Sequence, residues 1–377
     1  MRVALGTIVV AALLAAGCKP AAQTLGRVVD VGAPDGVTLK GTLFPSASPG
    51  PAVLLLHQCD DRRSVWDPLG QRLAAAGITA LAIDYRGFGE SGGPRYDTLS
   101  NEQKAAVTAT AWPGDFDAAL AFLSRQSGVD AGRMGAAGGS CGVNNVIHLA
   151  QRHANVKALV LLAGPADREA RTFIEAPGAP PVFTAAAADD RYADFVLVAS
   201  WQFGISPRTE SRFAQYRDGG HAAVVLRTHP ELADLIVRWF GAVLDNMPAS
   251  LPPTNGVPLS PAVLEGVNAI ETPGGAAAAH PLLPEYIVNW IGYEHLGLKD
   301  TGTALEIMKL NATSYPKSAN AQDSLADAYV AAGDAASALT SAKRALELLD
   351  ADTSVTAQQK DGIRSAAETK IARLSKR

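Results

Sequence analysis

Ser140 lies in a motif that could supply a catalytic nucleophile. It is the central residue of Gly-Gly-Ser-Cys-Gly at positions 138–142, between a short apolar run and a helix-length stretch. Glycines two positions before and after a serine are needed where a strand turns sharply into a helix, because larger side chains there would collide with neighbouring backbone. The turn presents the hydroxyl at a helix amino terminus, where the helix dipole stabilises developing negative charge. The motif therefore predicts that Ser140 attacks a carbonyl carbon.

The apolar pattern around this motif predicts the elements that would hold the serine. Five short apolar runs are separated in part by amphipathic, helix-length stretches, and they lie at 51–57, 78–84, 133–138, 156–163 and 181–187. This alternation predicts a mostly parallel sheet with helices on both faces. A hairpin is predicted before them, around the turn Pro34-Asp35-Gly36.

Three further elements are predicted to complete this region. Residues 211–217 form a weaker strand-like run, and residues 230–244 a last helix. Residues 195–200 (Phe-Val-Leu-Val-Ala-Ser) fit a helix or a strand. We expect a helix there, because parallel strands need a crossover between them.

Over residues 27–245 the chain resembles the α/β-hydrolase family, particularly its compact lipoprotein and dienelactone-hydrolase-like members. Residues 54–59 are similar to the family's strand 3 and oxyanion loop, with Gln58 where glycine is commoner. Residues 83–91 are similar to its strand 4 and Arg-Gly-x-Gly-x-Ser turn. The resemblance implies an α/β fold with a doubly wound, mostly parallel sheet. It implies no large cap, because only the fifteen residues 165–179 stand where many members carry one.

The same resemblance implies which residues act with Ser140. The family's acid follows strand 7 and its histidine follows strand 8, which gives Asp190 as the acid and His221 as the base. Asp189 is the alternative acid, and its other expected role is to cap the following helix. His229 is the alternative base, although its neighbour Pro230 makes it typical of a residue that enters a helix. The other histidines are expected to be surface or satisfied core residues: His57, His148, His153, His280 and His295.

The implied chemistry is nucleophilic acyl transfer. His221 would take the proton of Ser140, and Asp190 would hold the imidazole and stabilise the imidazolium. Backbone N–H groups of Cys59 and Cys141 would form the oxyanion hole, and water would hydrolyse the acyl-serine. No metal-ligand spacing, phosphate loop or dinucleotide fingerprint occurs in the sequence, so neither a cofactor nor a metal is expected.

Cys59 and Cys141 would then face the same small space. Disulfides need Cα atoms about 4.4–6.8 Å apart, and the two oxyanion positions are expected near that range. One interpretation is a disulfide that braces the oxyanion hole, and the other is two free buried thiols that fill space. A third makes Cys141 the nucleophile, as in dienelactone hydrolases, but Val143 rather than glycine follows two positions later.

The amino terminus is predicted to be an export signal. Apart from Thr7, residues 3–17 are apolar or small, and this run is shorter than the roughly 20 residues that cross a bilayer. Leu-Leu-Ala-Ala-Gly-Cys at 13–18 resembles the bacterial lipoprotein signal. The resemblance implies a signal over residues 1–18, cleavage before Cys18 and lipid attachment to the Cys18 sulfur. An ordinary secretory signal is the alternative. Lys19 after the cysteine implies an outer-membrane anchor facing the periplasm, with residues 19–26 as a tether.

The carboxyl-terminal part is predicted to be helical and repetitive. Residues 246–284 are rich in proline and glycine, which predicts a linker around one short helix near 261–271. In residues 285–377 a shift of 34 aligns Ala304 with Ala338 and Ile291 with Leu325. This period resembles the tetratricopeptide repeat, with a polar cap helix at 356–374; a generic pair of helical hairpins is the alternative. So few repeats are expected to pack against the first domain.

Composition excludes several classes of protein and of partner. The chain has 377 residues, 47% of them hydrophobic, which excludes a disordered chain. Three cysteines exclude a disulfide scaffold. A net charge of −4 without a dense basic run indicates no nucleic-acid partner. The expected function is a serine hydrolase of carboxylesterase type acting on small or exposed esters, with contact to the membrane only through the lipid. A protein partner of the repeats is also expected. A peptidase, a dienelactone-type hydrolase and a non-catalytic scaffold are the alternatives.

Overall fold

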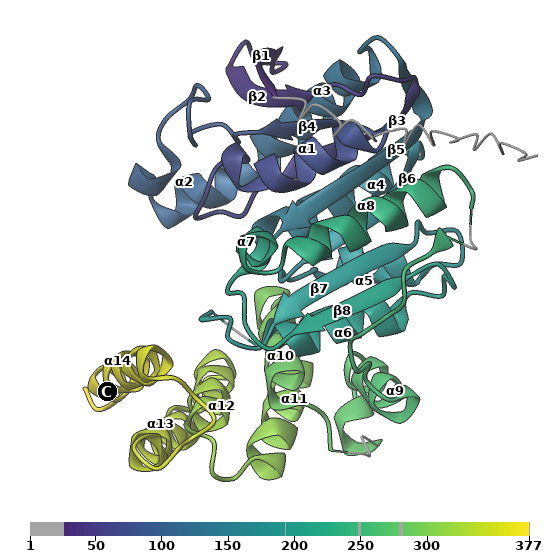
Figure 1. The fold of residues 1–377 in the computed structure, drawn as a ribbon. Helices are drawn as coiled ribbons and strands as arrows, with labels where there is room; N and C mark the ends of the chain where they lie inside the picture. The colour runs from purple at the N-terminus through teal and green to yellow at the C-terminus, as the bar shows by residue number, and fades with distance from the viewer. Residues whose placement is uncertain (1–25, 193, 248–249, 279–281, 377) are drawn as a thin grey trace, which may run out of the picture.

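An eight-stranded sheet forms the centre of the molecule (Figure 1). The computed structural model describes residues 26–192, 194–247, 250–278 and 282–376. Cys18 and the predicted signal lie outside these residues, as does most of the tether. The sheet order is β1-β2-β4-β3-β5-β6-β7-β8. The strands are β1 (Arg27–Gly32), β2 (Thr38–Phe44), β3 (Gly50–Leu56), β4 (Thr79–Ile83), β5 (Val129–Gly139), β6 (Val156–Leu162), β7 (Val182–Ala187) and β8 (Arg212–Tyr216).

The strand directions agree with the predicted mostly parallel sheet. β1 pairs with β2 and β2 with β4 in antiparallel fashion, and all other neighbours are parallel. Every residue of β3, β4 and β7 is buried. Strands covered on both faces are expected to be continuous apolar runs rather than alternating ones. That is why the central strands could be recognised from their apolar runs.

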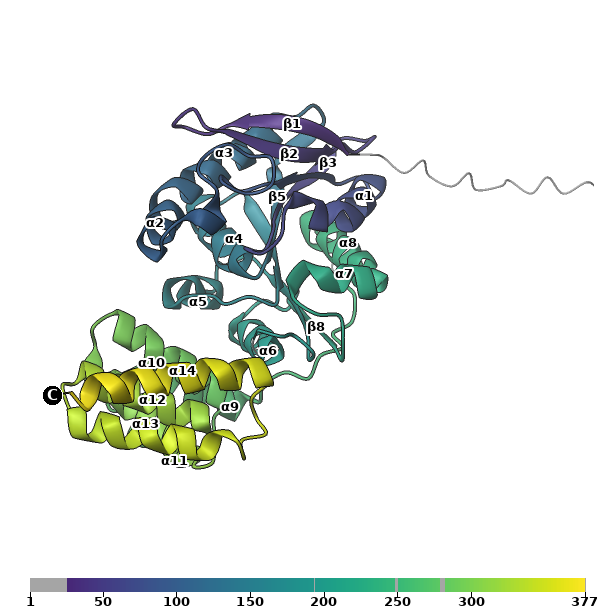
Figure 2. The same ribbon diagram turned by 90° about the vertical axis from the view of Figure 1, so that its left-hand side faces the viewer.

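Helices cover both faces of the sheet (Figure 2). Helices α1 and α8 pack on one face, and α3, α4, α5 and α6 pack on the other. The helices of this region are α1 (Asp67–Ala75), α2 (Asn101–Ala106), α3 (Trp112–Ser124), α4 (Cys141–Arg152), α5 (Arg168–Glu175), α6 (Phe195–Ile205), α7 (Val225–Thr228) and α8 (Pro230–Leu244). The ambiguous segment 195–200 is therefore helical, as expected.

The carboxyl-terminal helices follow the predicted 34-residue spacing. They are α9 (Pro261–Ile270), α10 (Glu285–Gly297), α11 (Thr301–Ser314), α12 (Ala319–Ala331), α13 (Ala335–Leu349) and α14 (Ala357–Leu374). The first residues of α10 and α12 are Glu285 and Ala319, and those of α11 and α13 are Thr301 and Ala335. Asp300 and Asp334 cap α11 and α13 through the same side-chain bond. Two helical hairpins thus repeat, and their membership of the tetratricopeptide class stays a prediction.

The segment predicted as a linker packs against the region of the central sheet. Val267 and Ile270 of α9 and Leu283 are buried in the same apolar cluster as α3, α4 and β5. A Cβ on Gly204 of α6 would lie 2.7 Å from Leu264 of α9, so these two helices are in close contact. The C-terminal helices lie beyond the β8 end of the sheet in Figure 1, with α10 against α6 and α9.

Over residues 26–192, 194–247, 250–278 and 282–376, no helix combines the length and apolar character needed to cross a bilayer.

Candidate catalytic site

Ser140 stands at a sharp turn between β5 and α4. Its backbone has φ 53° and ψ −120°, a conformation that costs energy for a residue with a side chain and that occurs at functional sites. A Cβ on Gly138 would lie 2.1 Å from the carbonyl oxygen of Gly142. A Cβ on Gly142 would lie 2.5 Å from the carbonyl oxygen of Leu56. Both glycines of the motif are thus required by close backbone approach, which is the arrangement predicted for a nucleophile elbow.

Asp190 and His221 are paired at the carboxyl ends of β7 and β8. His221 Nδ1 lies 2.7 Å from Asp190 Oδ2, and the side chains are 7% and 1% exposed. Because Nδ1 is engaged by the carboxylate, Nε2 is the nitrogen left to accept a proton from a serine. The geometry therefore brings together the acid and base expected from the sequence.

Asp189, the alternative acid, has another role. Its carboxylate accepts hydrogen bonds from the backbone N–H groups of Gly219 (3.2 Å) and Gly220 (2.9 Å). It holds the turn before His221 and does not contact the imidazole. Its expected role as a helix cap is wrong, because the cap of α6 is Asp194, which accepts from Leu197 N.

The loop that carries His221 lies against the elbow. A Cβ on Gly139 would be 3.3 Å from Ala222 Cβ, so the residues preceding Ser140 and following His221 are neighbours. No hydrogen bond joins the Ser140 hydroxyl to His221 in the described chain. In enzymes without substrate such bonds are often long and shorten when substrate binds.

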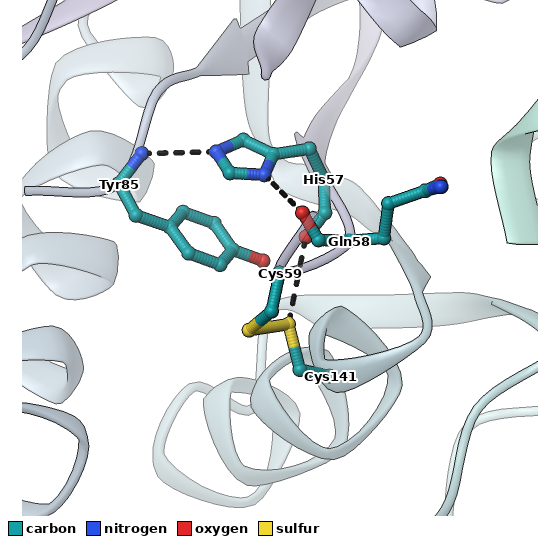
Figure 3. Close-up of a disulfide and its surroundings, with 5 residues drawn as sticks. All are labelled: His57, Gln58, Cys59, Tyr85 and Cys141. Atoms are coloured by element: carbon teal, nitrogen blue, oxygen red, sulfur yellow. Dashed lines mark hydrogen bonds between the residues drawn. A yellow bond between two sulfur atoms is a disulfide. The ribbon is translucent and has the colours of Figure 1, made fainter. Parts of the chain in front are cut away.

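Cys59 and Cys141 form a disulfide (Figure 3). The Sγ atoms are 2.14 Å apart and the Cα atoms 5.9 Å apart. The bond joins the loop after β3 to the first residue of α4, directly after Ser140. Of the interpretations left open by the sequence, the structure therefore has the disulfide. It also leaves no thiol at Cys141 to act as a nucleophile.

His57, next to this disulfide, is a satisfied core residue (Figure 3). It is fully buried, its Nδ1 lies 2.6 Å from the carbonyl oxygen of Gln58, and its Nε2 accepts from Tyr85 N at 3.2 Å. The imidazole stacks on the Tyr85 ring with centroids 4.1 Å apart. Because Nε2 accepts from Tyr85 N, the proton of the ring lies on Nδ1, which donates to the carbonyl oxygen of Gln58. Burial lowers the pKa of His57. The contact between Cys141 Sγ and His57 O has no proton to share, because the sulfur is in the disulfide.

The other histidines that the structure describes bind carboxylates away from the elbow. The alternative base His229 has Nε2 2.9 Å from Asp218 Oδ1 and Nδ1 3.0 Å from Glu231. It precedes α8, as expected for a residue that enters a helix. His148, His153 and His295 pair with Asp167, Asp117 and Asp300. His280 lies outside the described residues.

Two residues near His221 were missed by the sequence analysis. Tyr192 donates to Asp60 Oδ2 at 2.7 Å, and its ring meets the imidazole of His221 edge-on with centroids 4.5 Å apart. Asp60 directly follows Cys59, so this contact joins loops about 130 positions apart. No pattern in the sequence indicates this contact, because it joins the side chains of two loops.

Among the residues that the structure describes, no three His, Cys, Asp or Glu side chains are grouped so as to hold a metal ion.

Residues 47–189 match the family model described as serine aminopeptidase, S33. Two uncharacterized proteins of Mycobacterium tuberculosis (strains CDC 1551 / Oshkosh and ATCC 25618 / H37Rv) are 36% identical over 140 residues, which is 36% of this chain. The match spans 46% of each relative, or about half of its length.

Solved structures similar to this chain include two esterases. That of Pyrococcus furiosus has a TM-score of 0.45 at 18% identity and covers 58% of this chain and 93% of its own. That of Exiguobacterium antarcticum has a TM-score of 0.42 at 15% identity and covers 56% and 98%.

The match to the family model begins just before β3 and includes the elbow and Asp189, while β8 and His221 come after it. The sheet order, the elbow and the position of the acid and the histidine after β7 and β8 extend the same architecture to the end of the sheet. The chain therefore has the α/β-hydrolase fold.

Proposed function

We propose that the protein is a serine hydrolase that cleaves carboxylic esters through an acyl-serine intermediate. The observation that carries the proposal is the bond between His221 Nδ1 and Asp190 beside a serine at a positive φ. Ser140 Oγ attacks the carbonyl carbon while Nε2 of His221 takes its proton. His221 then protonates the leaving alcohol. Water next attacks the acyl carbon and gives a proton to His221, which returns it to Ser140 Oγ as the acyl group is released.

The oxyanion hole of this reaction would be made by backbone N–H groups of Cys59 and Cys141. The disulfide fixes the two residues with Cα atoms 5.9 Å apart, one on the loop after β3 and one at the start of α4. Donors held in place before the reaction stabilise charge that develops on the carbonyl oxygen, and loss of one typically lowers the rate by about 10²–10³. Since these donors are backbone groups, the disulfide contributes by positioning them.

The proposed substrates are small esters or exposed ester groups on larger molecules. Only α5 occupies the place where larger members of the fold insert a cap, and it has eight residues. A peptidase is the second candidate, because the matching family model is described as a serine aminopeptidase. The two candidates share the acyl-serine, and they differ in whether an alcohol or an amine leaves.

Placement in the cell and a partner are further parts of the proposal. The signal sequence supports an exported protein whose Cys18 carries lipid at the outer membrane. The two helical hairpins of residues 285–377 support a protein partner, since repeated hairpins commonly present binding surfaces.

A fluorophosphonate probe tests the proposed chemistry. The protein without residues 1–18 should be labelled at one serine, and Ser140→Ala should abolish labelling while thermal unfolding shows that the fold is kept. Ser124→Ala, at the far end of α3, is the matched control and should be labelled like the parent. Absence of labelling in the folded parent would reject the serine-hydrolase proposal. Comparing matched ester and amide substrates would then separate an esterase from a peptidase.

A further inference from the structure

Three consecutive residues tie the loop after β3 to three different catalytic loops. The side chain of Gln58 accepts from Ala223 N at 3.1 Å, next to the loop of His221. Cys59 is bonded to Cys141 beside the nucleophile. Asp60 accepts from Tyr192, on the loop that follows Asp190. The first two contacts are buried or half-buried, whereas the third crosses the surface of the site.

The contact between Asp60 and Tyr192 lies directly beside the catalytic histidine. The Tyr192 ring is edge-on to His221, and on another side the Phe195 ring lies 5.4 Å from the same imidazole. Arg191 reinforces the contact, with Nη2 2.7 Å from the Tyr192 hydroxyl and 3.3 Å from Asp60 Oδ2. Tyr192 is 43% exposed, so part of the residue faces solvent.

This position is the one that a leaving group must pass. The substrate carbonyl oxygen would point toward Cys59 and Cys141, and the leaving-group atom must meet His221 to be protonated. Tyr192 spans from His221 to Asp60, which directly follows Cys59. A bulky leaving group beside the imidazole would therefore meet the Tyr192 ring.

We propose that Tyr192, held by Asp60, is a specificity-determining residue that limits the size of the leaving group. The inference rests on the proposed serine-hydrolase function and adds the substrate class: esters of small alcohols. The acyl side of the site is not restricted by this contact.

Two phosphonylating probes that share one phosphonyl group test the inference. One loses fluoride and the other the larger 4-nitrophenoxide. In both, the Ser140 Oγ–P bond forms, the bond from phosphorus to the leaving group breaks, and the serine proton passes to His221. We expect Tyr192→Ala to raise the ratio of the nitrophenoxide rate to the fluoride rate by about tenfold, the scale of steric discrimination in a pocket. Asp60→Ala and Tyr192→Phe, which keep the ring but lose the bond, should each give a smaller rise.

Tyr293→Phe is the matched control. Tyr293 lies on α10 and is 40% exposed. Its hydroxyl donates to Asp327 of α12 at 2.9 Å. This variant should leave the ratio unchanged. A second pair of probes shares one leaving group and differs in the length of the chain on phosphorus. The ratio of their rates should be the same in the parent and in the variants.

Each result decides a different point. An unchanged leaving-group ratio in Tyr192→Ala and Asp60→Ala would overturn the inference alone, and so would an equal gain for longer chains on phosphorus. If neither probe labels Ser140 in the folded parent, the proposed function fails, and the inference fails with it.

Discussion

Asp189 and Asp190 are adjacent carboxylates with separate tasks. Both leave the end of β7, but only Asp190 turns toward the imidazole, and Asp189 holds two backbone N–H groups of the next loop. Adjacent side chains in a turn point in different directions. A difference of one position along the chain therefore determines which carboxylate reaches His221. Variants of Asp189 and Asp190 therefore provide a matched comparison, because each removes the same charge from neighbouring positions.

Asp190→Asn should lower kcat by about 10⁴, because the amide favours the wrong imidazole tautomer and cannot stabilise the imidazolium. Asp189→Asn keeps one acceptor for the Gly219–Gly220 turn and should cost far less. Hydrolysis of 4-nitrophenyl acetate by the two variants measures both values. Equal losses, or a larger loss for Asp189→Asn, would show that the acid has been assigned to the wrong residue.

The sequence was sufficient to predict that Asp190 and His221 pair and that Ser140 stands at the turn after β5, since each follows a recognisable strand and their order is fixed by the fold. It could not decide whether Cys59 and Cys141 were bonded, because that depends on how closely the end of β3 approaches the start of α4. Nor could it indicate the contact between Asp60 and Tyr192, which joins two loops by exposed side chains. Contacts between loops have no periodicity, and so they leave no pattern in the sequence.

At the scale of elements, the disulfide fastens β3 to α4 across 82 positions of sequence. By the chain-entropy model a loop of this size should stabilise the fold by about 4 kcal/mol, and engineered cases often give less. We expect Cys59→Ala/Cys141→Ala to lower the free energy of unfolding by about 2–4 kcal/mol, and kcat to fall more than KM rises. Urea unfolding and steady-state kinetics measure these effects.

Reduction of the parent provides an independent comparison for the disulfide. Parent protein treated with dithiothreitol should unfold at the same urea concentration as the double variant. If neither treatment changes the unfolding midpoint or kcat, the bond neither stabilises the fold nor positions the oxyanion donors.

A second link between elements joins α4 to α5. His148 Nε2 lies 2.8 Å from Asp167, whose carboxylate also caps α5 by accepting from Ala170 N. The hydrogen bond to Asp167 raises the pKa of His148 above its ordinary 6.5. Burial opposes the charged form of Asp167, but the hydrogen bond from His148 and others outweigh it and hold the pKa of that carboxyl well below its usual range.

The pH dependence of this link follows from the raised pKa of His148. Its stabilisation is fully present below the unfolded pKa and is lost as pH rises through the folded pKa. We expect the difference in unfolding free energy between the parent and His148→Gln to shrink between about pH 6 and pH 8. Asp167→Asn keeps the helix cap and should remove the same dependence. A difference that stays constant over this range would contradict the protonated pair.

At the scale of the whole molecule, α6 connects the central sheet to the C-terminal helices. Its sequence is apolar on all sides, which made the segment ambiguous, because an amphipathic pattern is expected of a helix with one exposed face. Phe195 and Val198 face the cluster next to His221, whereas Trp201 and Ile205 share a cluster with α9 and α10. A helix that is covered on all sides has no polar stripe. The reason for the apolar sequence of α6 therefore lies in elements located more than 60 positions later.

Arg171 of α5 is the charged centre of this contact. Its side chain is 5% exposed and binds Glu271, which follows α9, at 2.9 Å and Glu294 of α10 at 2.7 Å. The guanidinium also stacks on the Trp201 ring, 4.4 Å from its centroid. Removing one member of a buried ion group leaves uncompensated charge and costs about 3–5 kcal/mol. Arg171→Met should therefore lower the free energy of unfolding by that amount, as measured by urea denaturation.

Arg168 supplies the control, because its Nε lies 3.4 Å from the same Glu271 but its side chain is 44% exposed. Arg168→Met should cost at most about 1 kcal/mol, as exposed ion pairs do. The triple variant Arg171→Met/Glu271→Gln/Glu294→Gln should recover part of the loss, because no buried charge is then left unpaired. Equal effects of Arg171→Met and Arg168→Met would mean that the C-terminal helices are held by apolar contacts alone. In that case, replacing Trp201 rather than Arg171 should release them from the catalytic sheet.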